Sequence, residues 1–556
     1  MTTRWACVWG RFAAIGVTGL AGALLAAVVL AGLARPVLAG DESKPKPDES
    51  SVKAPVRLDY IDALIEEGWA KAKVKPARMA TDEEFLRRVY LDLLGRIPNV
   101  QEAKAFLAVR ESGKRQKLVE YLLEHPDYAK NFATQWTILL IGRNAQERMV
   151  DRGSLTSWLR KQFTANRPWS ETVHELVSGT GSNKENGAVN FVLAHLEFDA
   201  VPLTSRTTRL FLGQQIQCTQ CHDHPSNDWK QKDFWGVNAF FKGMRTEEVR
   251  KADATGLEAY DHTELRDEPT DSYVRFERRN GLMGIAFPQF LDGRKISQGT
   301  DVVRRSELGK LIADPKNGDM AKAFVNRMWA HFLGRGFVNP VDDFGSHNPP
   351  SHPELLDKMA ADFQNSGYDV KALCRWITAS RAYQLSAVRT KDNAKDEGLF
   401  NVMQLKPMTP EQLFDSLITA TTSHRAGTRE SDLKKRDAWM RQFLFAFAND
   451  EAEETTNFQG TIPQALMMMN GELMNDALSC KPGSFLHDVV TVASRQSRSP
   501  QNVMLDSVYL GALSRYPTTK ERNQGRQYLE SFPDHLQVLQ DLFWSLLNSN
   551  EFILNH

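Results

Sequence analysis

The chain has 556 residues, enough for roughly two to four domains of ordinary size. Its 69 basic and 69 acidic side chains cancel, so there is no excess positive charge for binding the phosphates of a nucleic acid. It has only one long apolar run and five cysteines, which excludes a polytopic membrane protein and a disulfide-stapled scaffold.

The N-terminal region has the pattern of an export signal. An apolar run at residues 12–33 follows two arginines, and small residues favour cleavage after Ala39. We therefore predict a signal peptide at residues 1–39 and a disordered linker, rich in Pro, Ser, Lys and Glu, at residues 40–56. The apolar run is also long enough to span a bilayer, so it would act as a membrane tether if it were not cleaved. Either way, the sequence predicts a location in the periplasm or cell envelope.

From Tyr60 onward most segments have the apolar spacing of amphipathic helices, and one unit occurs twice. An apolar stripe, a break at Arg-x-Pro and a capping-box-like signal at residues 85–102 return at residues 504–521 in the same register. After a short length change, residues 122–128 face residues 546–552. We interpret this as an internal duplication of a helical unit, and we expect its two copies to pack together.

The middle of the chain, residues 245–299, is polar and rich in turns. Tyr273-Val274-Arg275-Phe276 followed by Asn280-Gly281 predicts a strand and a hairpin turn. The predicted fold class is therefore mainly α, with two helical halves, the internal helical duplication and a small β-containing middle segment. The predicted domains are residues 57–244, the partly β insertion at 245–299 and residues 300–556.

Several helices are predicted around this middle segment. Residues 203–216 look helical and lead into a cysteine motif, and residues 321–333 are strongly amphipathic. Ser351-x-x-Glu354 has the spacing of a capping box, which predicts a helix over residues 354–363. Residues 369–382 predict a further helix.

The motif that carries chemistry is Cys218-Thr219-Gln220-Cys221-His222. Cys-x-x-Cys-His is the pattern of covalent haem attachment. Two thiols at this spacing can each add to one vinyl group of a porphyrin, and the adjacent histidine then supplies an axial nitrogen to the iron. We therefore predict haem c on Cys218 and Cys221, with His222 as the axial iron ligand. Export agrees with this prediction, because haem is joined to such proteins outside the cytoplasmic membrane.

Other interpretations of the motif remain open. Zinc or another transition metal could bind Cys218, Cys221 and either His222 or His224, with a fourth ligand from elsewhere. The two thiols could instead form a disulfide or stay inert. If haem is bound, His224 would orient His222 or a haem propionate.

The surroundings of a haem are less well defined by the sequence. Met244 and His195 are candidates for the sixth iron ligand, and an iron with an open site is a third possibility. Five aromatic side chains crowd the motif and either wall the macrocycle or form helix core: Trp229, Phe234, Trp235, Phe240 and Phe241. Cys374 and Cys480 either pair or are separate thiols.

Long stretches of the chain resemble two known families. Residues 203–241, with CTQCHDHP and DFWGVNAFF, and residues 82–103 resemble the planctomycete cytochrome C-like domain, domain of unknown function 1549. FVNRMWAHFLGRGFVNPVDDFG and NPPSHPELLDKMA resemble the planctomycete-specific C-terminal domain, domain of unknown function 1553. The resemblance implies an exported c-type cytochrome of the cell envelope with one haem site, and it implies no established reaction.

A second candidate site lies in the C-terminal half. Asp342, Asp343, His347 and His352 could form a carboxylate–histidine cluster, or they could serve as caps and turn residues. The leading prediction is one-electron transfer with envelope redox or assembly partner proteins. The alternative is an envelope enzyme or carbohydrate-associated binding protein that uses this cluster and a structural zinc site. A third hypothesis is a purely structural assembly protein.

Overall fold

The computed structural model describes residues 59–143, 149–252, 256–268, 273–296, 302–391, 393, 397–421, 438–444, 468–469, 471–496 and 499–556. The predicted signal peptide and linker lie outside these residues.

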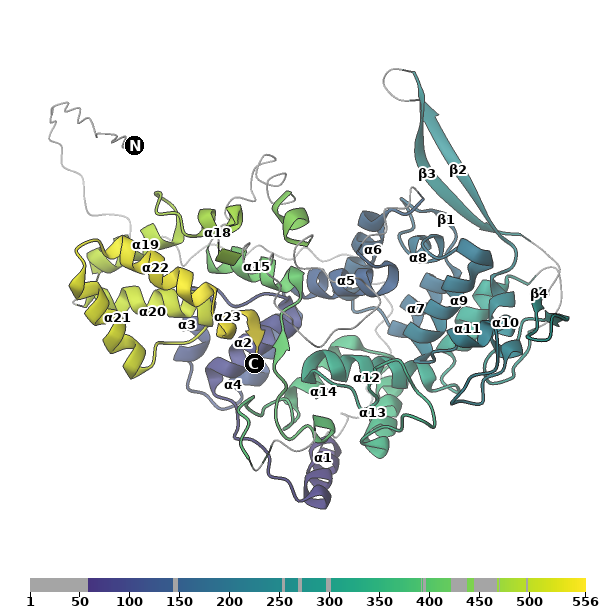
Figure 1. Cartoon of the computed structure of the whole chain (residues 1–556), viewed down its shortest axis with the longest axis horizontal. Helices are drawn as coiled ribbons and strands as arrows, with labels where there is room; N and C mark the ends of the chain where they lie inside the picture. The colour runs from purple at the N-terminus through teal and green to yellow at the C-terminus, as the bar shows by residue number, and fades with distance from the viewer. Residues whose placement is uncertain are drawn as a thin grey trace, which may run out of the picture. The chain divides into compact units, whose positions relative to one another are not determined.

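The first part of the chain is helical (Figure 1). Local capping chemistry sets where several helices begin: Thr81 and Asn99 each form a reciprocal capping box with a glutamate three residues later. The helices are α1 (Asp59–Ala72), α2 (Asp82–Leu94), α3 (Val100–Ala108), α4 (Lys114–Leu123), α5 (Pro126–Ile141), α6 (Arg152–Thr164), α7 (Trp169–Ser178), α8 (Val189–Leu193), α9 (Glu197–Leu212) and α10 (Gln231–Asn238), with the 3₁₀ segments η2 (Gln217–Gln220) and η3 (Ala239–Phe241). The helix predicted over residues 203–216 thus ends at Leu212.

The middle segment contains two antiparallel hairpins. β2 (Met244–Ala252) pairs with β3 (Glu258–Asp267), and β3 also pairs with the short β1 (Gly181–Ser182). Figure 1 shows the β2–β3 ribbon extending away from the neighbouring helices. β4 (Val274–Glu277) pairs with β5 (Met283–Ala286), and Gly281 takes the positive φ of +77° that the turn requires. The predicted strand and hairpin turn are confirmed.

The second part of the chain returns to helices. They are α11 (Arg304–Ala313), α12 (Asp319–Leu333), α13 (Pro353–Asn365), α14 (Val370–Ala379), α15 (Pro410–Ala420), α18 (Glu472–Ala477), α19 (Phe485–Gln496), α20 (Pro500–Leu513), α21 (Thr519–Ser531), α22 (His535–Leu547) and α23 (Asn550–Ile553), with η4 (Glu397–Leu399) and the paired strands β6 (Lys406–Pro407) and β7 (Leu554–Asn555). None of the helices in the described ranges is both long and apolar enough to cross a bilayer.

The capping box predicted at Ser351 is wrong. Pro353 occupies the first helical position of α13, which places the N-cap at His352, and no side chain caps this end. The hydroxyl of Ser351 instead lies 3.1 Å from Nδ1 of His352.

The described residues from Asp59 onward form one compact unit with two hydrophobic cores. The larger core draws on buried residues between Ile61 and Met403 together with Leu510, and the second draws mainly on residues 408–552. In the larger core Trp136 stacks on Phe324 with 5.8 Å between ring centroids, and Phe324 stacks on Phe363. Helices before and after the β-containing segment therefore share one core. The predicted domain limits stay a prediction, and the mainly α fold with small sheets is confirmed.

The two copies of the duplicated unit lie in contact. Arg87 of α2 is fully buried and donates to the backbone carbonyls of Ala512 at the end of α20 and of Phe552 in α23. The predicted packing of the two copies therefore agrees with the structure.

Candidate functional site

The Cys-x-x-Cys-His motif lies in a short irregular segment between α9 and α10. Gly213 ends α9 with a φ of +69°, and η2 then holds Cys218. The backbone N–H of Cys221 donates to the carbonyl of Cys218 at 3.4 Å, so both cysteines sit on one tight turn. Both are free thiols; Cys221 is exposed and Cys218 is half-buried. Neither cysteine of the motif is therefore a buried core residue.

The imidazole of His222 is held in one orientation. Its Nδ1 lies 2.7 Å from the backbone carbonyl oxygen of Asp223. A carbonyl oxygen can only accept, so Nδ1 carries the proton of this hydrogen bond. Nε2 of the neutral ring then keeps its lone pair, which is the arrangement that metal-ligating histidines commonly show.

The carbonyl of Gln220, inside the motif, accepts two hydrogen bonds from α10. Nε2 of Gln231 and Nε1 of Trp235 each donate to it at 3.1 Å. Nε2 of Gln231 also donates to the carbonyl of Glu277 at the end of β4, at 2.8 Å. The motif is thus fixed to α10, and through Gln231 to the β4–β5 hairpin.

His224 supports the turn that follows the motif. Its Nδ1 accepts from the backbone N–H groups of Ser226 and Asn227, at 3.1 and 2.9 Å. Burial, followed by the neighbouring His347, lowers the pKa of His224, so the ring stays neutral near pH 7.

The second predicted cluster forms only in part. Asp343 and His347 meet, with 3.2 Å between the carboxylate and Nε2 of His347. The His347 ring centroid lies 6.2 Å from that of His224, and its Nδ1 lies 3.1 Å from Oδ1 of Asn227. His352 lies apart, against the rings of Phe337 and Phe400.

Asp342 points away from its neighbour Asp343 into the protein. It is 1 % exposed and accepts hydrogen bonds from Arg209 and from Gln215, the latter at 3.0 Å. Arg327 of α12 also contacts it at 3.4 Å. Asp342 therefore has a structural environment, and the four predicted residues do not converge on one point.

Residues 342–347 form a loop, here called the clamp loop, that contacts both flanks of the cysteine motif. Upstream, Phe344 donates its backbone N–H to the carbonyl of Gly213 at 3.0 Å, and a Cβ on Gly213 would lie 2.6 Å from the Phe344 ring. Downstream, His347 contacts Asn227. Sequence reasoning missed this contact, because nothing local at Gly213 indicates which distant ring approaches it.

Two protein-family models match the chain, one over the range that contains the cysteine motif and one over the range that contains the clamp loop. Residues 60–246 match the family PSCyt2, described as protein of unknown function DUF1549, and residues 304–529 match PSD1, described as protein of unknown function DUF1553. The chain therefore contains a PSCyt2 segment followed by a PSD1 segment. No curated protein and no solved structure matches the chain.

The motif, α9 and α10 thus lie in the PSCyt2 domain, and the clamp loop lies in the PSD1 domain.

The aromatic residues near the motif divide into two groups. Phe234, Phe240 and Phe241 are buried, whereas Trp229 and Trp235 are only half-buried. The indole N–H of Trp229 donates to Oε1 of Gln214 at 3.3 Å. The two tryptophans therefore line the PSCyt2 motif, and the three phenylalanines are helix core.

The candidates for a sixth ligand are placed as follows. Nε2 of His195 lies 2.7 Å from the carbonyl of Leu140, so this nitrogen is already used, and burial lowers the pKa of His195 to about 4. Met244 is half-buried at the first position of β2.

The other two cysteines of the described residues do not pair. Cys374 is buried and Cys480 half-buried, and the two are separate free thiols.

The zinc alternative requires at least three ligands in one place. Within the described ranges, no three His, Cys, Asp or Glu side chains come together in a way that could hold a metal ion. A zinc site at the PSCyt2 motif is therefore not preformed there.

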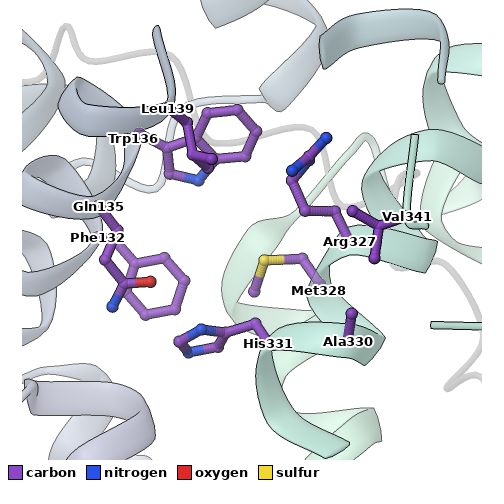
Figure 2. Close-up of a pocket in the computed structure, with 9 residues that line it drawn as sticks. All are labelled: Phe132, Gln135, Trp136, Leu139, Arg327, Met328, Ala330, His331 and Val341. Carbon is purple, nitrogen blue, oxygen red and sulfur yellow. The ribbon is translucent and has the colours of Figure 1, made fainter. Parts of the chain in front are cut away.

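A cavity of about 220 Å³ lies between α5 of the PSCyt2 domain and α12 of the PSD1 domain (Figure 2). One wall consists of side chains from α5: Phe132, Gln135, Trp136 and Leu139. The facing wall comes from α12 and the segment after it: Arg327, Met328, Ala330, His331 and Val341. None of the predicted site residues lines it. The cavity is connected to the motif through Arg327, which contacts Asp342. Asp342 in turn accepts a hydrogen bond from Gln215, just before the motif.

Proposed function

We propose that this chain is an exported c-type cytochrome that transfers single electrons in the cell envelope through one haem bound at Cys218, Cys221 and His222. The observation that carries the proposal is the combination of two free cysteines on one turn, neither of them buried, with an adjacent imidazole whose Nδ1 is hydrogen-bonded to a backbone carbonyl. The family name PSCyt2 agrees with it.

The donor set fits a haem. Cys218 and Cys221 would form the two thioether bonds, and Nε2 of His222 would be the axial ligand, since its other nitrogen is engaged by Asp223. The Asp223 contact fixes both the tautomer and the rotation of the ring, which reduces the entropy lost on ligation. When bound, the haem supplies one-electron redox chemistry at its iron.

The other residues of this region position the attachment segment. Gln231 and Trp235 hold the Gln220 carbonyl between the two cysteines, and the clamp loop holds Gly213, Gln215 and Asn227 on either side. A rigid frame of this kind keeps the two thiols and the imidazole in a constant mutual arrangement. It would also limit structural change between oxidation states, which favours electron transfer.

The test is export of the whole chain from a host that carries a haem-ligation system. We expect a pyridine haemochrome spectrum of the c type and a mass increase of one haem. Cys218→Ser and Cys221→Ser should each prevent attachment through one thioether, and His222→Ala should shift the spectrum through loss of an axial ligand.

Cys480→Ser is the matched control, because this half-buried thiol lies outside the motif. It should leave the haem content unchanged. Colourless wild-type protein that is folded and exported would refute the proposal, and stoichiometric zinc in that protein would support the alternative site.

A further inference from the structure

The β4–β5 hairpin carries large apolar side chains on its outer face. Leu282, Met283, Ile285 and Phe287 are 62 %, 63 %, 56 % and 48 % exposed. Met283, Ile285 and Phe287 alternate along the chain and so share one face. We call these four residues the apolar tip. A large apolar group so concentrated on a short hairpin marks an interaction surface.

The inner face of the same hairpin already has a partner within the protein. Val274, Phe276, Gly284 and Ala286 are buried, and Phe276 stacks on Trp235 of α10 with 5.7 Å between centroids and 9° between planes. Antiparallel sheets with one buried face normally place polar residues on the other. Packing inside the chain therefore explains the inner face. On the apolar tip it accounts only for the edge contact of Phe287 with Tyr273, at 6.2 Å between ring centroids, and not for Leu282, Met283 and Ile285.

Basic side chains surround the apolar tip. Arg275 lies opposite Ile285 in the strand register, and Arg278 and Arg279 lie in the turn that leads to Leu282. All three are exposed, and Glu277, opposite Met283, is the one acidic residue of the two strands and their turn. The surface thus combines apolar side chains with a local excess of two positive charges, three arginines against one glutamate.

We propose that the apolar tip and Arg278 and Arg279 insert into the surface of an anionic lipid bilayer. The arginines match the negative headgroups, and the apolar side chains match the boundary with the acyl chains. A protein partner is less suited to this shape, because a stable protein interface buries about 800 Å² on each side, and strands of four residues offer far less. Lipid can close around a narrow protrusion.

This inference does not depend on the bound haem. If both proposals hold, the surface contact would keep the cysteine motif close to the membrane, because Gln231 joins Gln220 of the motif to Glu277 at the end of β4.

The experiment measures hydrogen exchange in the whole chain, with and without phosphatidylcholine vesicles that contain phosphatidylglycerol. A local readout is needed because residues 12–33 could also bind lipid. We expect protection of residues 274–287 on the anionic vesicles and none on pure phosphatidylcholine. Protection that appears without vesicles and rises with protein concentration would indicate a protein–protein surface and would overturn the proposal.

Two variants separate the contributions. Arg278→Gln with Arg279→Gln should reduce the population of lipid-inserted hairpin by about 25-fold, since each basic residue near an anionic surface contributes about fivefold. Leu282→Ser with Met283→Ser should reduce it by more than about tenfold. Both pairs are exposed and lie at the turn or beside it, so the fold should persist.

The matched control is Tyr528→Ser with Phe532→Ser. These two aromatic side chains are 41 % and 49 % exposed with 5.1 Å between ring centroids, and they lie on and beside α21, outside the hairpin. It should leave protection of residues 274–287 unchanged. Equal loss in the control and in the hairpin variants, or protection that is independent of anionic lipid, would contradict the proposal.

Discussion

The two copies of the duplicated unit share the contacts at their turns and differ on the faces of their first helices. In the first copy Arg96 forms a bidentate ion pair with Glu102, contacts Asp127 and lies 5.6 Å from the ring centroid of Tyr90. In the second, Arg515 does the same with Glu521, Glu551 and Tyr509, at 5.5 Å from the ring centroid. Asn99 and Thr518 begin the next helix in the same way, each with a capping box.

The interior positions have diverged. The first copy carries Arg87, Arg88 and Asp92 on α2, all within 1 % of complete burial. Asp92 accepts from Tyr383, Lys406 and Asn555 at 2.7 to 2.8 Å. The matching positions of α20 hold Asp506, Ser507 and Gly511. The comparison shows that the local turn chemistry was kept, while the helix face changed with its neighbours.

The largest effect should come from the buried carboxylate that the second copy lacks. Asp92→Ala leaves the half-buried Lys406 without its counter-charge, and desolvation already lowers the pKa of Lys406. We expect a loss of about 3–5 kcal/mol in the free energy of unfolding. Asp506→Ala in the other copy, where the side chain is 26 % exposed and pairs with Arg522, should cost less than about 1 kcal/mol. Denaturant unfolding of the two variants measures both, and equal losses would break the comparison.

The helix ends give the next effect. Gly95 and Ser514 both end their helices with positive φ, +71° and +59°. A Cβ on Gly95 would lie 2.5 Å from Oδ1 of Asn131, so Gly95→Ala should cost about 2 kcal/mol or more. Ser514→Gly should instead stabilise the protein by about 1 kcal/mol, because glycine adopts this conformation without strain. Thermal unfolding would show opposite shifts, and shifts of the same sign would be inconsistent with the pairing of these positions.

The shared arginines should behave alike. Arg96→Lys and Arg515→Lys each replace a bidentate contact with a single point charge, so each should cost about 1 kcal/mol. The loss at Arg96 should be the greater one, because its side chain is 14 % exposed against 21 % for Arg515. Denaturant midpoints of the two variants test this order.

The smallest effect depends on pH. Arg515, followed by the capping contact with Thr518, lowers the pKa of Glu521 from 4.5 to about 2. A carboxylate whose pKa is lowered by folding stabilises the folded state at pH values above its pKa in the unfolded chain. This contribution is lost as the pH falls from about 4.5 towards 2. The difference in unfolding free energy between wild type and Glu521→Gln should therefore shrink between about pH 5 and about pH 3. A constant difference would mean that the charge of Glu521 is not what matters.

Features of the fold that depend on a few neighbouring residues could be predicted from the sequence. The capping boxes at Asn99 and Thr518, the hairpin turn at Gly281 and the cysteine motif were all recognisable from short spacings. Ser351 misled because the same spacing fits a capping box, while Pro353 decided where the helix begins.

The candidate site was less accessible to prediction. His222 could be assigned from its place beside Cys221, but its hydrogen bond to Asp223 could not. The clamp loop reaches the motif across more than a hundred residues of sequence, and no periodicity links His347 to Asn227. Such contacts are set by tertiary packing, which a single sequence does not display.

The shared aromatic core has an evolutionary consequence. Trp136 and Trp169, from the PSCyt2 domain, pack on Phe324 of the PSD1 domain, and Phe363 extends the stack. A recombination event that separated the two coding segments would leave each product with a large apolar surface exposed to water. Selection against that outcome would keep both segments in one reading frame, and a natural protein with only one of them must cover this face with different side chains.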